Sequence, residues 1–276
     1  PDRIRARPEH RSMSSQMIGG ADVWDIRADL TGRRVLVTGG ASGIGKAAAR
    51  LFAECGAIVA VNHLESDSRG PETVGEFNEA GYQAITAPGD VSNAEDCDAM
   101  VKKAIAALGG LDILINNAGT PVSIEPIPFD DIDAMTEDFW AKILATNLLG
   151  PFRCVKAAAP ALRDGGGAIV NTASIASFGG IGSSIAYAAS KAGLMNITKN
   201  LSKGLAPHIR VNAVAPGLVN SPWTQAWPEE RKARSVANSG LARMVEPEDI
   251  ARTMLFLAVN TAMTGQTVVV DCGRQV

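Results

Sequence analysis

Two tyrosines occur in this chain of 276 residues, and one of them, Tyr187, stands four residues before Lys191. The small residues around this pair favour a helix, on which positions i and i+4 lie on one face, so the Lys191 ammonium can lie near the Tyr187 phenol. A nearby positive charge favours the phenolate and lowers a phenol pKa that is ordinarily about 10. The pair is therefore a candidate general acid/base, although this spacing alone is equally compatible with an ordinary half-exposed helix pair.

Ser174 ends an apolar run that predicts a strand, upstream of Tyr187. A strand end followed by a loop and a helix can direct the serine hydroxyl toward the same point as the phenol. A second feature lies nearer the N-terminus, where a β-branched run ends at Thr38 and is followed by Gly39-Gly40-Ala41-Ser42-Gly43-Ile44-Gly45 and by a helical pattern from Lys46. Strand, glycine-rich turn and helix start form the setting in which backbone N–H groups bind a pyrophosphate.

These features resemble the short-chain dehydrogenase/reductase family over about residues 30–273. The glycine turn is similar to the family's cofactor loop, and further motifs follow in the family's order. The matching segments are Thr38-Gly39-x-x-x-Gly43-x-Gly45, Asp90-Val91, Asn116-Asn117-Ala118-Gly119, Asn147, Ser174, Tyr187-x-x-x-Lys191 and Pro216-Gly217. The resemblance implies a nicotinamide-dependent alcohol dehydrogenase or carbonyl reductase. A 3-oxoacyl-thioester reductase and a sugar or polyol dehydrogenase are the alternatives among enzymes, and a dinucleotide-binding sensor or scaffold is the non-enzymatic alternative.

The resemblance also implies a role for each catalytic residue. Tyr187 would be the general acid/base, Ser174 would hold the substrate oxygen, and Lys191 would lower the tyrosine pKa and bind the nicotinamide ribose. Asn147 would hold a water that connects Lys191 to solvent, although an asparagine after a long helix is also a common backbone cap. The expected cofactor-binding residues are Gly39, Ser42, Gly43, Ile44, Gly45, His63, Asp90, Val91, Asn117, Ala118, Gly119, Tyr187, Lys191, Pro216, Gly217, Val219 and Ser221.

The choice between NAD and NADP depends on the end of the second predicted strand, where NAD-preferring relatives carry an acid that binds the ribose 2′-OH. His63 occupies this position, with Glu65 close by, and Arg69 could reach a 2′-phosphate. We therefore expect NAD(P) as cofactor with a preference for NADP. Glu65 is the alternative ribose contact if NAD is preferred.

Short apolar runs alternate with helical patterns from residue 33 onward. The expected strands are Val35–Val37, Ile58–Asn62, Ala84–Ala87, Ile113–Asn116, Ala168–Thr172, Arg210–Val214 and Thr267–Val270. Strands that are apolar on both faces and separated by helices predict an α/β fold, a single doubly wound Rossmann-type domain with a seven-stranded parallel sheet. We expect this domain over residues 31–276, after an N-terminal extension at 1–30.

Two segments are candidates for the substrate pocket. Residues 219–241 follow the Pro216-Gly217 turn and are expected to form a substrate lid, in which Trp223 and Trp227 either pack on the domain or line an apolar pocket. The insertion 120–135 is either a surface loop or a pocket wall. Phe178 and Ile181, after Ser174, are expected to line the opposite side.

Composition limits the remaining possibilities. A net charge of −3 gives no support for nucleic-acid binding, and no apolar run is long enough to cross a bilayer. The four cysteines and three histidines are scattered without metal-ligand spacing, which predicts no metal site and reduced thiols in a cytoplasmic protein. The expected partner is a small, possibly hydrophobic substrate molecule. The resemblance implies a homotetramer or homodimer, in which another subunit covers the apolar edge strand Val268–Val270.

Overall fold

The computed structural model describes residues 26–179 and 182–274, so most of the expected N-terminal extension and Ile181 lie outside the described residues. A seven-stranded parallel sheet forms the centre of the domain, in the order β3-β2-β1-β4-β5-β6-β7, and confirms the predicted fold class. Every predicted strand is present, with bounds that differ by no more than two residues. The strands are β1 (Arg34–Val37), β2 (Ile58–His63), β3 (Gln83–Pro88), β4 (Ile113–Asn116), β5 (Ala168–Thr172), β6 (Arg210–Pro216) and β7 (Thr267–Val270).

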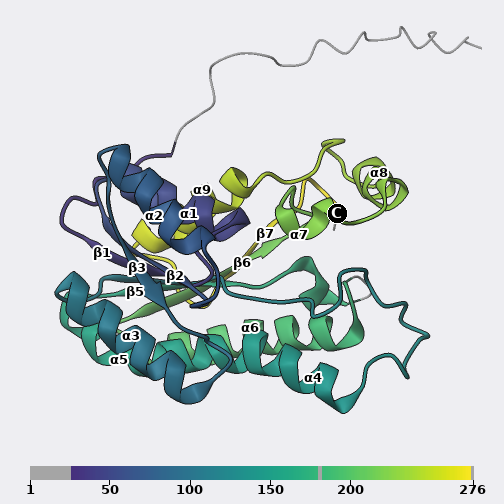
Figure 1. Ribbon diagram of the computed structural model, residues 1–276, viewed down its shortest axis with the longest axis horizontal. Helices are drawn as coiled ribbons and strands as arrows, with labels where there is room; N and C mark the ends of the chain where they lie inside the picture. The colour runs from purple at the N-terminus through teal and green to yellow at the C-terminus, as the bar shows by residue number, and fades with distance from the viewer. Residues whose placement is uncertain (1–25, 180–181, 275–276) are drawn as a thin grey trace, which may run out of the picture.

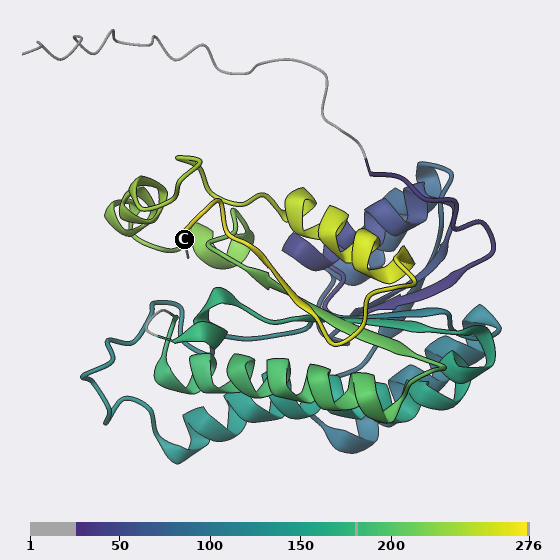
Figure 2. The same cartoon turned by 180° about the vertical axis from the view of Figure 1, so that it is seen from behind.

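Helices cover both faces of the sheet, as Figures 1 and 2 show from opposite sides. One layer contains α1 (Gly43–Glu54), α2 (Arg69–Glu79) and α9 (Pro247–Val259). The other contains α3 (Ala94–Leu108), α4 (Glu137–Leu144), α5 (Gly150–Gly165) and α6 (Ile185–Gly204). Two further helices, α7 (Pro222–Gln225) and α8 (Glu229–Ala237), lie beyond the carboxyl end of β6.

Successive side chains along each central strand point to opposite faces of the sheet, so the hydrophobic core is divided between the two helix layers. In β1, Val35 and Val37 pack in the cluster beneath α1 and α9, whereas Leu36 packs in the cluster beneath α3 and α5. All three side chains are fully buried. Burying one such side chain stabilises the fold by about 1.5–3 kcal/mol, so a sheet packed on both faces gives the loops at its edge a rigid base.

Helices α4 and α5 are joined without a loop by a π-helical segment, Ala145–Leu149. Thr136 begins α4 as predicted, because its hydroxyl accepts a hydrogen bond from the Phe139 N–H at 3.3 Å. Pro151 has no N–H to donate to the carbonyl of Asn147, so the regular ladder cannot continue here, and the Gly150 N–H bonds instead to Ala145. Asn147 therefore lies inside a continuous helical segment. The sequence had suggested that it follows the end of a helix.

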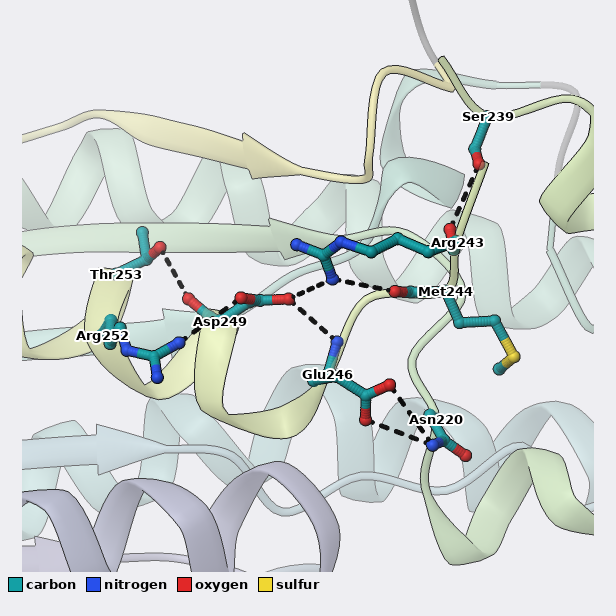
Figure 3. A network of polar contacts seen from close by, with 8 residues as sticks. All are labelled: Asn220, Ser239, Arg243, Met244, Glu246, Asp249, Arg252 and Thr253. Carbon is teal, nitrogen blue, oxygen red and sulfur yellow. Dashed lines mark hydrogen bonds and ion pairs between the residues drawn. The ribbon is translucent and has the colours of Figure 1, made fainter. Parts of the chain in front are cut away.

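The segment that carries α7 and α8 leaves and re-enters the domain at one point. Val219 and Val245 form a parallel bridge there, and Asn220 donates to Glu246. Beside this contact, Arg243 and the N–H of Glu246 both bond to the carboxylate of Asp249, at 2.7 and 3.1 Å (Figure 3). We call this group of contacts the base clamp. It fixes both ends of the segment 220–245 against the start of α9.

No helix in the described part of the chain is long and apolar enough to span a membrane.

Candidate active site

A cleft of about 1050 Å³ opens at the carboxyl ends of the strands, where an open parallel sheet binds its ligands. Most of the predicted site residues line it. They are Gly39, Ser42, Gly43, Ile44, His63, Asp90, Val91, Asn117, Ala118, Gly119, Ser174, Tyr187, Lys191, Pro216, Gly217, Val219 and Ser221. Gly45 and Asn147 do not line the cleft, and each has a different place in the structure.

The glycine turn between β1 and α1 forms a cradle that side chains would close. Gly39 and Gly43 have positive φ values of 60° and 50°, which favour glycine. A Cβ on Gly45 would lie 2.1 Å from the carbonyl oxygen of Gly39, so Gly45 acts behind the cradle by permitting close packing. Ser42, the N-cap of α1, makes no side-chain cap, and no acidic residue lies in the first turn. The amino end of α1 thus fits the pyrophosphate of a dinucleotide, whose charge its N–H groups and helix dipole would stabilise.

Thr38 and Asn117 lock this cradle to the loop after β4. The Thr38 hydroxyl accepts from the N–H groups of Asn117 and Ala118 at 2.9 and 3.1 Å. The Asn117 amide donates to the carbonyls of Thr38 and Gly39 at 3.2 and 3.1 Å. Because these bonds use side chains from two neighbouring strands, the loops keep one relative position and the cleft between them is preformed.

Ser174, Tyr187 and Lys191 converge on the other side of the cleft. Ser174 lies in the loop after β5, and its hydroxyl accepts from the Ala176 N–H at 3.1 Å and acts on the pKa of the Tyr187 phenol. Ser184 caps α6 by accepting from the Tyr187 N–H at 3.1 Å, which places Tyr187 in the first turn. Lys191 follows one turn later, and its Nζ donates to the carbonyl of Thr172 at 2.7 Å. The predicted strand–loop–helix arrangement therefore brings these three side chains together.

The pKa of Tyr187 differs in direction from the sequence expectation. The half-buried side chain lines the cleft, and its burial raises the pKa to about 12 against the opposing effect of the Ser174 hydroxyl. Burial likewise lowers the pKa of Lys191 to about 8. The expected lowering of the tyrosine pKa by Lys191 is therefore not found, and desolvation, which disfavours the charged form of both groups, sets the direction of both shifts.

Asn147 is fully buried behind Gly119. Its side-chain oxygen accepts from the Thr120 N–H at 2.8 Å, and its amide donates to the Thr120 carbonyl at 2.9 Å. This pair of bonds fixes the start of the insertion 120–135 beside Lys191. The side chain of Asn147 therefore positions backbone at the cleft wall.

Asp67, at the β2 end of the cleft, is a site residue that sequence reasoning missed. His63 is buried there, its Nδ1 lies 2.9 Å from the Leu64 carbonyl, and its Nε2 has no partner among the described residues. Asp67 and Arg69 line the cleft beside it as a bidentate ion pair with distances of 2.8 and 2.7 Å, whereas Glu65 does not line it. The sequence did contain a signal for Asp67, because an acid two residues before an arginine can form an ion pair with it.

The β6 end of the cleft has an aromatic wall. Trp223 and Trp227 both line it, and Trp223 meets Tyr187 edge to face with ring centroids 5.9 Å apart. Thr120 and Val122 bring the insertion to the same wall. The prediction for Phe178 is wrong, because its side chain is half exposed outside the cleft lining. It lies on a 3₁₀ turn, Ile175–Phe178, that directs Ile175 and Ala176 inward instead.

Within residues 26–179 and 182–274, no group of three or more histidine, cysteine, aspartate or glutamate side chains is arranged to hold a metal ion.

Known proteins share this arrangement. The family described as Enoyl-(Acyl carrier protein) reductase matches residues 39–275. The 3-oxoacyl-[acyl-carrier-protein] reductase FabG of Staphylococcus aureus is 37% identical over 246 residues, which cover 87% of this chain and 97% of the relative.

Two solved structures are similar over almost their whole length. A short-chain dehydrogenase from Burkholderia cenocepacia in complex with NADP is 30% identical with a TM-score of 0.82, covering 90% of this chain and 100% of the other. A 3-oxoacyl-[acyl-carrier protein] reductase from Brucella melitensis with bound NAD is 33% identical with a TM-score of 0.79, covering 91% of this chain and 94% of the other. With its doubly wound sheet and nucleotide cradle, this chain belongs to the short-chain dehydrogenase/reductase family of NAD(P)-dependent oxidoreductases.

Proposed function

We propose that this protein interconverts a ketone and a secondary alcohol, with Tyr187 as the general acid/base. The observation that carries the proposal is the convergence of Ser174, Tyr187 and Lys191 on one side of the nucleotide cleft. A bound nicotinamide supplies or accepts the hydride, and the protein must supply the matching proton at the substrate oxygen. A phenol with a pKa of about 12 is a neutral proton donor at physiological pH.

In the direction of reduction, the Ser174 hydroxyl and the Tyr187 phenol both donate to the substrate carbonyl oxygen. As the carbon accepts the hydride, that oxygen gains negative charge and takes the phenol proton. The Lys191 ammonium then stabilises the phenolate that remains. Its Nζ lies 5.8 Å from the centroid of the tyrosine ring, in a buried site where charges interact strongly.

Asn147 is proposed to hold a water that returns a proton toward Lys191. Its carbonyl receives no helical hydrogen bond from Pro151, and its side-chain oxygen and the Nζ of Lys191 both lie within 4 Å of where a Cβ on Gly119 would stand. Both observations support a polar path beside Lys191.

NADP is the proposed preferred cofactor. A histidine, His63, and not an acid stands at the end of β2, and Arg69 lines the cleft beside it. Arg69 would bind the 2′-phosphate by turning from Asp67. Asp67, which replaces Glu65 as the candidate ribose contact, supports NAD as the alternative, because the Arg69 ion pair keeps its pKa low and its carboxylate charged.

A 3-oxoacyl thioester is the second candidate substrate, supported by the names of the Staphylococcus and Brucella proteins. A panel of simple ketones, sugars and 3-oxoacyl thioesters, followed by NADPH and NADH absorbance, separates these classes. Reduction of any panel ketone that is abolished in Tyr187→Phe supports the mechanism. Unchanged reduction in that variant overturns it.

A homotetramer or homodimer is also proposed. Strand β7 is an edge strand whose Val269 is 39% exposed, and Phe256 of α9 is 39% exposed nearby in sequence. Another subunit would cover this apolar edge, which would otherwise invite aggregation. Light scattering at micromolar concentration tests this, and a monomer with full activity contradicts it.

A further inference from the structure

Three arginines gather at the β6 end of the cleft. Arg231 and Arg234 come from α8, and Arg274 comes from the tail after β7. Both views show α8 beside the end of the described chain, and Arg274 donates a hydrogen bond to Ser235 of α8 (Figures 1 and 2). The acids that line the cleft are Asp67 and Asp90, which follow β2 and β3 at the opposite end. The cleft is thus positive at its β6 end.

Two of these arginines form no ion pair within the described part of the chain. Arg234 pairs with Glu230 at 3.2 Å, but no carboxylate of residues 26–179 or 182–274 lies in ion-pair distance of Arg231 or Arg274. Burial lowers the pKa of Arg231, and repulsion from Arg274 and Arg234 lowers it further. Bringing unpaired like charges together is unfavourable, and a bound anion would relieve both the repulsion and the desolvation.

Two buried hydrogen-bond donors without partners lie in the same region. The indole Nε1 of Trp227 is buried without an acceptor among the described residues. The hydroxyl of Ser183 likewise has no partner within residues 26–179 and 182–274, and this residue is only 6% exposed. Both residues line the cleft. Buried donors normally have partners, so this region offers unused hydrogen bonds to an acceptor from outside the chain.

Arg231 is held in an orientation that suits oxyanion binding. Its guanidinium lies over the Trp227 ring, with Cζ 4.5 Å from the ring centroid. A guanidinium fixed by its face keeps the N–H donors of its edge available for a bidentate bond to a carboxylate or phosphate. Arg231 and Arg274 also line a second cavity of about 430 Å³, beside Pro126–Phe129 of the insertion. An anion at these arginines would therefore lie on the substrate side.

Trp223, Trp227 and Arg231 follow one another at intervals of four residues. The first contacts Tyr187 and the second contacts Arg231, so this segment connects the proposed acid to the arginines by an aromatic surface. A substrate could place its carbonyl at Tyr187, its apolar chain along the tryptophans and an anionic end at Arg231.

We propose that the substrate is a carbonyl compound with an oxyanion at a distance from the reacting carbon, and that Arg231 and Arg274 bind this oxyanion. The proposal rests on the proposed ketone reduction and names its substrate class. The oxyanion has two possible sources, a carboxylate on the acyl chain or the phosphate of a pantetheine-type thioester.

Matched substrates test the charge. The monomethyl ester of 3-oxohexanedioic acid and its dimethyl ester differ by one carboxylate. A 3-oxobutanoyl thioester of pantetheine 4′-phosphate and that of pantetheine differ by the phosphate. We expect the wild type to prefer the charged member of one pair, which identifies the source. Arg231→Gln and Arg274→Gln should lower its kcat/KM about 10- to 100-fold, mainly through KM, and change the neutral member less than about 3-fold.

Arg163→Gln, on the exposed surface of α5, is the matched control and should change none of these values. The Kd of NADPH, measured by fluorescence, should be unchanged in all three variants. Equal losses for charged and neutral substrates, or weaker NADPH binding, would overturn the proposal.

A binding experiment separates this proposal from the proposed reaction. Calorimetric titration of the enzyme with NADP⁺ and hexanedioic acid monomethyl ester needs no turnover. Weaker binding in Arg231→Gln, without turnover of any ketone, supports the anion site while the reaction fails. Turnover of neutral ketones without a charge preference in either substrate pair overturns the anion site alone.

Discussion

The Nζ of Lys191 lies 5.8 Å from the centroid of the Tyr187 ring and donates its hydrogen bond to the Thr172 carbonyl. The lysine is therefore tethered to the end of β5 beside the tyrosine and is not bonded to the phenol oxygen by a direct ion pair. In this arrangement, burial dominates both pKa values, and the two groups remain a neutral phenol and a weakened base. The charge on Lys191 matters most when the phenol gives up its proton.

Removing the phenol hydroxyl tests the proton donor. Tyr187→Phe keeps the ring that contacts Trp223, so we expect the fold and the cofactor affinity to persist. Turnover should fall by at least about 100-fold, because a positioned acid contributes about 10²–10⁴-fold. Steady-state reduction and NADPH fluorescence titration measure the two effects. A variant that loses both turnover and NADPH binding would contradict a role limited to proton transfer.

The rate of ketone reduction should depend on the charge of Lys191. With a pKa of about 8, the ammonium that stabilises the phenolate is lost as the pH rises through 8, so kcat/KM for NADPH should fall above that pH. Tyr187 does not cause the fall, because its pKa is about 12. A pH–rate profile at constant ionic strength gives the inflection. Lys191→Arg, which stays charged throughout, should lack it, and an unchanged inflection in that variant would assign it to another group.

Replacing Lys191 should stabilise the protein while it abolishes activity. The pKa falls from 10.5 to about 8 on folding, so folding disfavours the ammonium, and this cost is complete below pH 8 and fades as the pH rises toward 10.5. We expect Lys191→Met to raise the free energy of unfolding by about 1–2 kcal/mol at neutral pH, after the loss of the bond to Thr172 is counted. Urea unfolding at neutral pH and near pH 10.5 measures this difference in the free energy of unfolding. A gain that does not shrink at high pH would contradict the explanation.

Two glycines should respond in opposite ways to alanine. In Gly45→Ala, the new Cβ would meet the Gly39 oxygen at 2.1 Å, so we expect about 1–3 kcal/mol of destabilisation and a marked loss of NADPH affinity. Gly75 lies inside α2 with no atom within 4 Å of its Cβ position, so Gly75→Ala should stabilise by about 0.5–1 kcal/mol. Thermal unfolding and NADPH titration check both. Equal effects would contradict close packing at the cradle.

Arg69 should determine the cofactor preference. We expect Arg69→Ala to lower kcat/KM for NADPH about 10- to 100-fold and that for NADH less than about 3-fold, because only NADPH has the 2′-phosphate. Asp67→Ala frees Arg69 and should favour NADPH further. Arg50→Ala, which removes a surface pair with Glu54, is the control. A wild type that prefers NADH, with this preference lost in Asp67→Ala, would instead identify Asp67 as the ribose contact.

The sheet could be predicted from the sequence because its central strands are apolar on both faces, as Val35–Val37 and Ile113–Asn116 illustrate. The positions of Ser174 and the glycine turn followed, since parallel strands end at one edge. Three features could not be predicted in this way. The sign of the Tyr187 pKa shift depends on how densely other segments surround the phenol. The π-helical site of Asn147 depends on how the chain adapts to Pro151. Arg231 and Arg274 meet only through the packing of α8 against the tail.

The base clamp has a consequence for how such an enzyme can change over evolution. Because Val219 and Val245 are paired, the chain between them leaves the domain and returns to it at the same place. The ion pair between Arg243 and Asp249 holds this place against the start of α9. Insertions or exchanges inside this segment alter loop-closure entropy only slowly with length and leave the seven strands untouched. The seven-stranded domain is thus structurally separate from the segment 220–245, which carries Trp223, Trp227 and Arg231. A change of substrate specificity could therefore be made by replacing the single contiguous segment 220–245.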